Sequence, residues 1–110
     1  MDNTRVTELL DELEAEVNNG GFDQYFYNSA GDNTAETIQA LDAVGAMHMA
    51  NILRRAAAKF PGGMPPKERF TRQAVLLELF PEAAAFEELD NEFYAYPDDL
   101  SSLLKKFVAA

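Results

Sequence analysis

The stretch Asn18–Glu36, NNGGFDQYFYNSAGDNTAE, decides how this chain folds, because it interrupts a regular acidic helix with a glycine pair and four aromatic rings. Ahead of it, apolar residues recur at about 100° per residue, which predicts a first helix from about residue 4 to 18. The residues on that apolar face are Val6, Leu9, Leu10, Leu13 and Val17. We expect the helix to stop at Asn19-Gly20-Gly21, since glycine accepts the left-handed cap that other residues resist.

Beyond the glycine pair the helical pattern resumes. Phe22, Tyr25 and Phe26 share one face for about two turns, while Tyr27 falls on the opposite face. The SAGDNT segment then predicts a turn, and Thr34 starts a new helix. Helical periodicity continues to Phe60, and Gly45 in its middle predicts two helices in place of one long one.

The second half of the chain predicts three more helices. A loop at PGGMPP, residues 61–66, precedes a helix over about 67–80 that Phe70, Ala74 and Leu77 mark. Pro81 opens another helix with its aromatic face inward, and the segment 96–99 begins the last one. No segment alternates with period two. The predicted fold is an all-α, compact single domain of about six short helices over residues 1–110, with an N-terminal acidic helix at 1–18.

Composition narrows the class of function. The apolar fraction of 47% is typical of a folded protein, and the chain has no cysteine. Neither a secretory signal nor a membrane-spanning run appears, so we expect a cytoplasmic protein with no membrane partner. The formal net charge of −10 repels nucleic acid and anionic lipid and attracts basic surfaces, unless the acidity serves solubility alone.

Catalytic chemistry has little support. His48 is the single histidine and lies at the edge of an apolar face, where we expect a packed or half-buried side chain. No second histidine or cysteine completes a zinc site, and no glycine-rich loop has phosphate-binding spacing. We therefore expect no enzyme, no metal and no cofactor. A small-molecule binder or hydrolase built around His48 is the remaining alternative.

Charge changes sign along the chain. Residues 1–50 carry a net −9, residues 51–80 a net +4 and residues 81–110 a net −5. We interpret the bases of the middle segment as intramolecular partners of the acidic ends. The alternatives are a nucleic-acid patch and the complement of an acidic face in a homodimer. These bases are Arg54, Arg55, Lys59, Lys67, Arg69 and Arg72.

The acids suggest a mimic of nucleic acid. Carboxylates four residues apart on a helix are separated by about 6 Å along the axis, close to the spacing of successive phosphates on one strand. Such a row would compete with DNA for a basic groove, and the contact would weaken with salt. The candidate row on the first helix is Glu8, Asp11, Glu12 and Glu16. A second candidate row is Glu87, Glu88, Asp98 and Asp99. The alternative is a plain solvated helix face.

Four segments carry a family resemblance: NGGFDQYFYNSAGD, ETIQALDAVGA, KFPGG and FEELDNEFYAYPDDLSSLLKKFV. Together they span residues 19–108, and the chain resembles a bacterial family of small acidic helical proteins, one branch of which consists of DNA mimics. The residues that match the family signature are Asn19, Gly20, Gly21, Phe22, Gln24, Tyr25, Phe26, Asn28, Ser29 and Gly31.

The resemblance implies an all-helical, non-enzymatic protein. For the mimic branch it also implies an acidic dimer that occupies the DNA-binding face of a transcriptional regulator or another basic protein. We interpret the signature as a folding element, in which rings pack, glycines cap, and Asn28 and Ser29 bond the turn. Tyr27 is the exception, as a candidate contact residue. In the rival interpretation, the aromatic and asparagine-rich turn binds a protein and the acidity is incidental.

Overall fold

The fold is described by a computed structural model that gives the backbone of residues 1–110 and every side chain except that of Ala83. The all-α prediction is confirmed: six α-helices follow one another, and no strand occurs in the part of the chain described. The helices are α1 (Asn3–Tyr27), α2 (Thr34–Val44), α3 (Met47–Ala57), α4 (Arg69–Leu79), α5 (Glu87–Tyr94) and α6 (Leu100–Ala109). Three short 3-10 turns, η1 (Ser29–Asn33), η2 (Pro61–Gly63) and η3 (Ala83–Phe86), join them.

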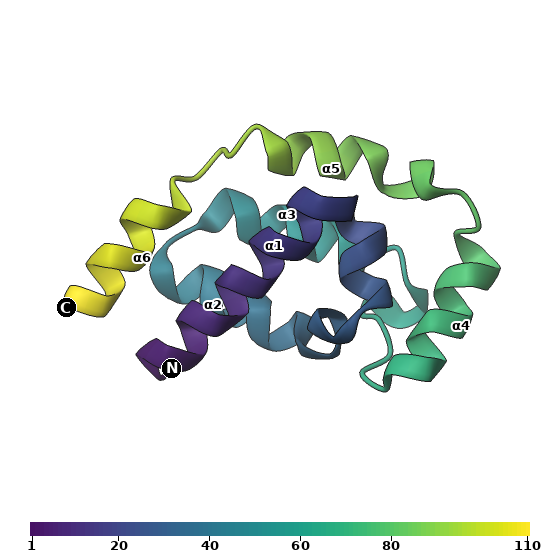
Figure 1. The fold of residues 1–110 in the computed structure, drawn as a ribbon, viewed down its shortest axis with the longest axis horizontal. Coiled ribbons are helices and arrows are strands. Elements are labelled where there is room, and N and C mark those ends of the chain that lie inside the picture. The colour runs from purple at the N-terminus through teal and green to yellow at the C-terminus, as the bar shows by residue number, and fades with distance from the viewer.

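Helix α1 crosses the molecule and the other helices surround it (Figure 1). Its first part buries the whole predicted apolar face, from Val6 to Val17. The helix is broken at the predicted glycine pair, where Gly20 (φ −153°) and Gly21 (φ 71°, ψ −173°) leave helical geometry. The chain turns there and resumes as a short helix that ends at Tyr27. The glycines thus redirect the chain, so that both parts of α1 face the core.

Gly45 separates α2 from α3, as predicted. It adopts the left-handed conformation (φ 84°), and the Ala46 amide donates to the Leu41 carbonyl at 2.8 Å while the Gly45 amide donates to Asp42 O. This pair of bonds is the Schellman arrangement that closes helices at a glycine. Because Gly45 ends α2, the two helices fold back and pack against each other.

Aromatic rings form the centre of the core. Phe26 lies 4.9 Å from Phe60 and 5.5 Å from Phe86 between ring centroids, and Phe22 lies 5.8 Å from Phe93. Edge-to-face and tilted pairs of this kind stabilise by about 0.5–1.5 kcal/mol beyond their buried area. The rings of the glycine-aromatic stretch therefore join η3, α5 and the segment that follows α3 to α1.

Two predicted details of the second half are wrong. Pro81 does not open an α-helix: the chain first makes the 3-10 turn η3, and α5 begins at Glu87. Helix α4 also exposes the apolar residues that mark it, since Phe70 is 77% and Leu77 61% exposed, while Arg72 is fully buried. The rotation of α4 depends on partners distant in sequence, as described below.

Candidate partner-binding surface

The outer face of α1 carries three exposed acids, Glu8, Asp11 and Glu12. Their single basic neighbour on the helix is Arg5, whose guanidinium donates to both carboxylate oxygens of Glu36 at 2.8 and 2.9 Å. This hydrogen bonding raises the pKa of Arg5 and lowers that of Glu36. Arg5 reaches Glu8 only at 3.8 Å. The acids therefore face solvent with little neutralisation.

Glu16, the fourth member of the predicted row, has another role. Its Oε2 accepts hydrogen bonds from Gln24 Nε2 at 2.7 Å and from Asn28 Nδ2 at 3.0 Å. The carboxylate is half-buried and ties the first part of α1 to the turn that follows Tyr27. We therefore place the accessible row on Glu8, Asp11 and Glu12.

The second predicted row is not one surface. Glu87 and Glu88 are exposed in the first turn of α5, whereas Asp98 and Asp99 lie beyond its other end. Asp99 caps α6 by accepting from the Ser102 amide at 3.1 Å. Asp98 is only 11% exposed in its side chain. These carboxylates cap helices and are not aligned along one helix face.

Asp98 and His48 join α3 to the segment before α6. Asp98 accepts from the Met49 amide at 2.8 Å, and His48 Nδ1 lies 2.9 Å from the other Asp98 oxygen. Desolvation alone would raise the pKa of Asp98, but these hydrogen bonds lower it. The expectation that His48 is packed is wrong, because 75% of its side chain is exposed. It borders an open groove of about 380 Å³ with Met47 and Asn51.

The basic segment is largely used inside the molecule, as interpreted from the sequence. Arg54 pairs with Asp42, and Arg55 makes a bidentate pair with Glu92 at 2.6 and 2.7 Å. Asp32 receives two arginines, Arg69 at 2.9 Å and Arg72 at 2.7 Å. These pairs draw the middle segment toward the acidic ends, and none of them involves the exposed acids Glu8, Asp11 and Glu12 of α1.

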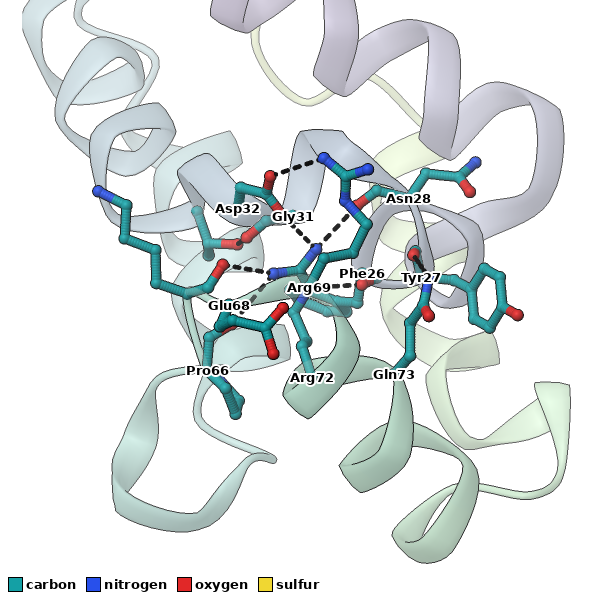
Figure 2. Close-up of polar contacts among 12 residues, drawn as sticks. Phe26, Tyr27, Asn28, Gly31, Asp32, Pro66, Glu68, Arg69, Arg72 and Gln73 are labelled. Carbon is teal, nitrogen blue, oxygen red and sulfur yellow. Dashed lines mark hydrogen bonds and ion pairs between the residues drawn. The ribbon is translucent and has the colours of Figure 1, made fainter.

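Arg72 is the structural centre of the signature turn (Figure 2). It donates to Phe26 O at 2.6 Å, Asn28 O at 2.9 Å and Asp32 Oδ1, and on the other side to the carbonyls of residues 66 and 67 at 3.1 and 3.0 Å. All five guanidinium donors can thus be satisfied without water. Sequence reasoning missed this role, because Phe26, Asn28 and Asp32 lie 40 or more residues away from Arg72.

The remaining signature residues surround that turn. A Cβ at Gly31 would lie 2.7 Å from Arg72 Nε, so the close approach requires glycine. Asn28 bonds as expected, whereas the Ser29 side chain is exposed and has no hydrogen-bond partner within the described chain. Tyr27 points away from the Arg72 network and is 43% exposed, as the helical pattern predicts.

Asp90 anchors the glycine pair. Its Oδ1 accepts from the Phe22 amide at 2.8 Å, and a Cβ at Gly21 would overlap its carboxylate. Desolvation in this half-buried position raises the pKa of Asp90 above its ordinary value, although the Phe22 hydrogen bond opposes the shift. The ionised carboxylate therefore destabilises the fold relative to the protonated one.

This shift predicts a pH-dependent effect of Asp90→Asn. The folded-state pKa is raised, so stability from this group is complete below about pH 3.9 and is lost as pH rises through the folded pKa. Asparagine keeps an acceptor for Phe22 and does not ionise. We expect the variant's stability relative to the parent to increase with pH in urea unfolding between about pH 3.5 and pH 7. A relative stability that falls over this range would contradict the burial of Asp90.

Comparison with known proteins identifies the family. A family model described as DMP19-like protein matches residues 3–110. The chain belongs to the DMP19-like family. The match extends ahead of the signature and includes α1 with its acids. No curated protein and no solved structure shows significant similarity to the chain.

The membership covers both parts of the site. The DMP19-like match includes the signature turn, which Arg72 holds from inside, and the acidic face of α1. Among the described residues, the signature side chains Gln24 and Asn28 hydrogen-bond to one acid of the predicted α1 row, Glu16, and to no other member of it. No described helix has the length and apolar character needed to cross a membrane.

Proposed function

We propose that this DMP19-like chain is a non-enzymatic DNA mimic whose α1 acids occupy the DNA-binding surface of a basic protein, such as a transcriptional regulator. The observation that carries the proposal is the exposed row of Glu8, Asp11 and Glu12 on a helix whose inner face is fully packed. Family membership supports the assignment, since the family includes DNA mimics.

The geometry suits the role. Glu8 and Glu12 are one turn apart, or about 6 Å along the axis, which is similar to the separation of neighbouring phosphates. Both lie on the part of α1 that the buried residues from Val6 to Val17 hold in place. A fixed row binds with little loss of conformational freedom, which favours recognition by a groove already shaped for DNA. Electrostatic attraction also speeds the encounter.

Charge reversal on α1 tests the proposal. Glu8→Lys/Glu12→Lys changes two acids to bases, and with it the net charge from −10 to −6. In a pull-down from bacterial lysate, we expect the parent chain to retain DNA-binding proteins that salt or duplex DNA releases. The variant should lose them by a factor of about ten or more, because two charge-assisted contacts become repulsive. Circular dichroism should show an unchanged fold.

A charge-matched variant serves as the control. Glu87→Lys/Glu88→Lys also gives a net charge of −6, but it alters the exposed first turn of α5. Retention of the partner by this variant would place binding on α1. Equal loss in both variants would mean that only total charge matters, and an unchanged affinity of the α1 variant would rule out the assignment.

The second candidate function uses the exposed ring of Tyr27. A tyrosine that is 43% exposed beside a rigid turn is a suitable contact residue for a protein partner. Under this alternative, Tyr27→Ala weakens the complex and salt has little effect, whereas under the mimic proposal salt has a strong effect and Tyr27→Ala a small one.

A further inference from the structure

Asn19 and Gly20 form the one Asn-Gly pair of the sequence, and both residues are exposed. The pair lies where the first part of α1 ends, because Gly20 (φ −153°) departs from helical geometry and Gly21 follows at φ 71°. An asparagine side chain can react with the backbone nitrogen of the next residue. Glycine leaves that nitrogen the least hindered, since it has no Cβ. Asn19 is therefore the asparagine of the chain best suited to this reaction.

Gln24 holds the Asn19 amide beside Gly20. Asn19 Nδ2 donates to Gln24 Oε1 at 3.2 Å. The same Gln24 oxygen lies against Gly20, since a Cβ added to the glycine would overlap it. Gln24 is itself fixed, because its Nε2 donates to Glu16 Oε2 at 2.7 Å. The Asn19 side chain is thus folded back toward the glycine, and the two groups that would react lie next to one oxygen atom.

We propose that Asn19 is a site of spontaneous deamidation, which adds a carboxylate to the acidic face of α1. The backbone nitrogen of Gly20 attacks Asn19 Cγ and forms a succinimide ring. The bond from Cγ to Nδ2 breaks, and Nδ2 leaves as ammonia with the proton of the Gly20 amide. Water then adds to one of the two ring carbonyls, and the ring nitrogen regains a proton as the ring opens. The product is aspartate or isoaspartate at position 19.

The new carboxylate continues the row of Glu8 and Glu12. Asn19 follows Glu12 by seven residues, which is two helical turns or about 10 Å along the axis, and it points in nearly the same direction. Glu16 would supply the charge of the intervening turn, but Gln24 holds its carboxylate. Deamidation therefore lengthens the accessible row toward the glycine pair. This consequence rests on the mimic proposal, because a partner bound along α1 is what would respond to the added charge.

Conversion replaces a hydrogen-bond donor with a charge. The Asn19 amide donates to Gln24 Oε1, whereas a carboxylate there can only accept, so this contact is lost. A negative charge near the end of a helix also opposes the helix dipole. Because Asn19 is exposed, solvent and salt screen these effects, and we expect the product to stay folded. The net charge changes from −10 to −11.

Incubation of the chain in mildly alkaline water enriched in heavy oxygen tests the chemistry, with tandem mass spectrometry of the digested protein. We expect residue 19 to take up heavy oxygen and to appear as separable aspartyl and isoaspartyl forms. Asn18 is the internal control, because it is equally exposed but precedes a residue with a side chain, and it should stay an amide. Gln24→Ala should slow conversion about twofold to tenfold, since the Asn19 amide is no longer held beside Gly20.

Two variants of equal charge test the effect on binding. Asn19→Asp and the control Asn91→Asp, on the exposed side of α5, both give a net charge of −11. In competition with duplex DNA for a protein that the chain retains, Asn19→Asp should be about twofold to fivefold more potent than the parent, and Asn91→Asp should match the parent.

The chemical and the binding results can fail separately. An unlabelled Asn19, labelling of Asn18 to the same extent, or faster conversion in Gln24→Ala would overturn the site as described. Equal potency of Asn19→Asp and Asn91→Asp would overturn its link to the acidic row. A parent chain that does not compete with DNA would overturn the mimic proposal and the role of the added charge, while heavy oxygen at residue 19 would still establish the deamidation site.

Discussion

Replacing Arg72 with methionine is expected to lower the free energy of unfolding by about 3–5 kcal/mol. Methionine fills a similar volume but has no donor, so the carbonyls of Phe26 and Asn28 and the carboxylate of Asp32 lose their interior partner. Since small domains are stable by only about 5–15 kcal/mol, much of the population should unfold under mild conditions. Urea unfolding followed by circular dichroism measures the change.

Arg69→Met provides the matched control. Arg69 precedes Arg72 by one helical turn and donates to the same carboxylate of Asp32 at 2.9 Å, but its side chain is 45% exposed. An exposed pair of this kind contributes about 0–1 kcal/mol. Arg72→Lys should resemble Arg72→Met more than the parent, because an ammonium cannot span acceptors on both sides of the guanidinium. Equal losses for Arg69→Met and Arg72→Met would contradict the role assigned to Arg72.

Gly21→Ala is expected to be the other large effect, with a loss of about 2–4 kcal/mol. The backbone at φ 71° and ψ −173° is a region that essentially only glycine occupies. The added Cβ would also lie 2.8 Å from the carboxylate carbon of Asp90, which itself bonds the Phe22 amide. Both strain and overlap therefore act at the point where α1 changes direction. Thermal and urea unfolding of the variant measure the loss.

Gly45→Ala separates strain from overlap. Gly45 also has positive φ, at 84°, but a Cβ there meets no atom within 4 Å. Its cost should be limited to the left-handed conformation, about 1–2 kcal/mol. A loss at Gly45 as large as that at Gly21 would show that the contact with Asp90 does not matter.

Local patterns predict most of the helices and the buried face of α1, but not the rotation of α4. The two helices around Gly45 follow from glycine at a helix end, and the apolar face from Val6 to Val17 follows from its period. The inward side of α4 could not be predicted, because helical periodicity favours burial of Phe70 over Arg72. The partners that reverse this choice lie at residues 26–32, far away in sequence.

The acids of the candidate surface were likewise predictable only where their neighbours lie on the same helix. The spacing of Glu8 and Glu12 placed them on one exposed face, since both lie on a single helix. The sequence predicts an acidic row that includes Asp98, because the partners that reveal its capping role, His48 and the Met49 amide, lie about 50 residues earlier in the chain. Spacing in the sequence predicts which residues are neighbours along one helix. It does not predict a carboxylate that caps a helix distant in sequence, because that contact forms only in the folded chain.

The mimic proposal is tested most directly by competition with DNA. A DNA-binding protein retained by this chain would be bound to a fluorescently labelled duplex, and the chain then titrated in while anisotropy is recorded. We expect the anisotropy to fall to that of free duplex, at a midpoint that rises steeply with salt and is lost for Glu8→Lys/Glu12→Lys. An anisotropy that stays constant or rises, with the chain bound while DNA remains in place, would contradict DNA mimicry.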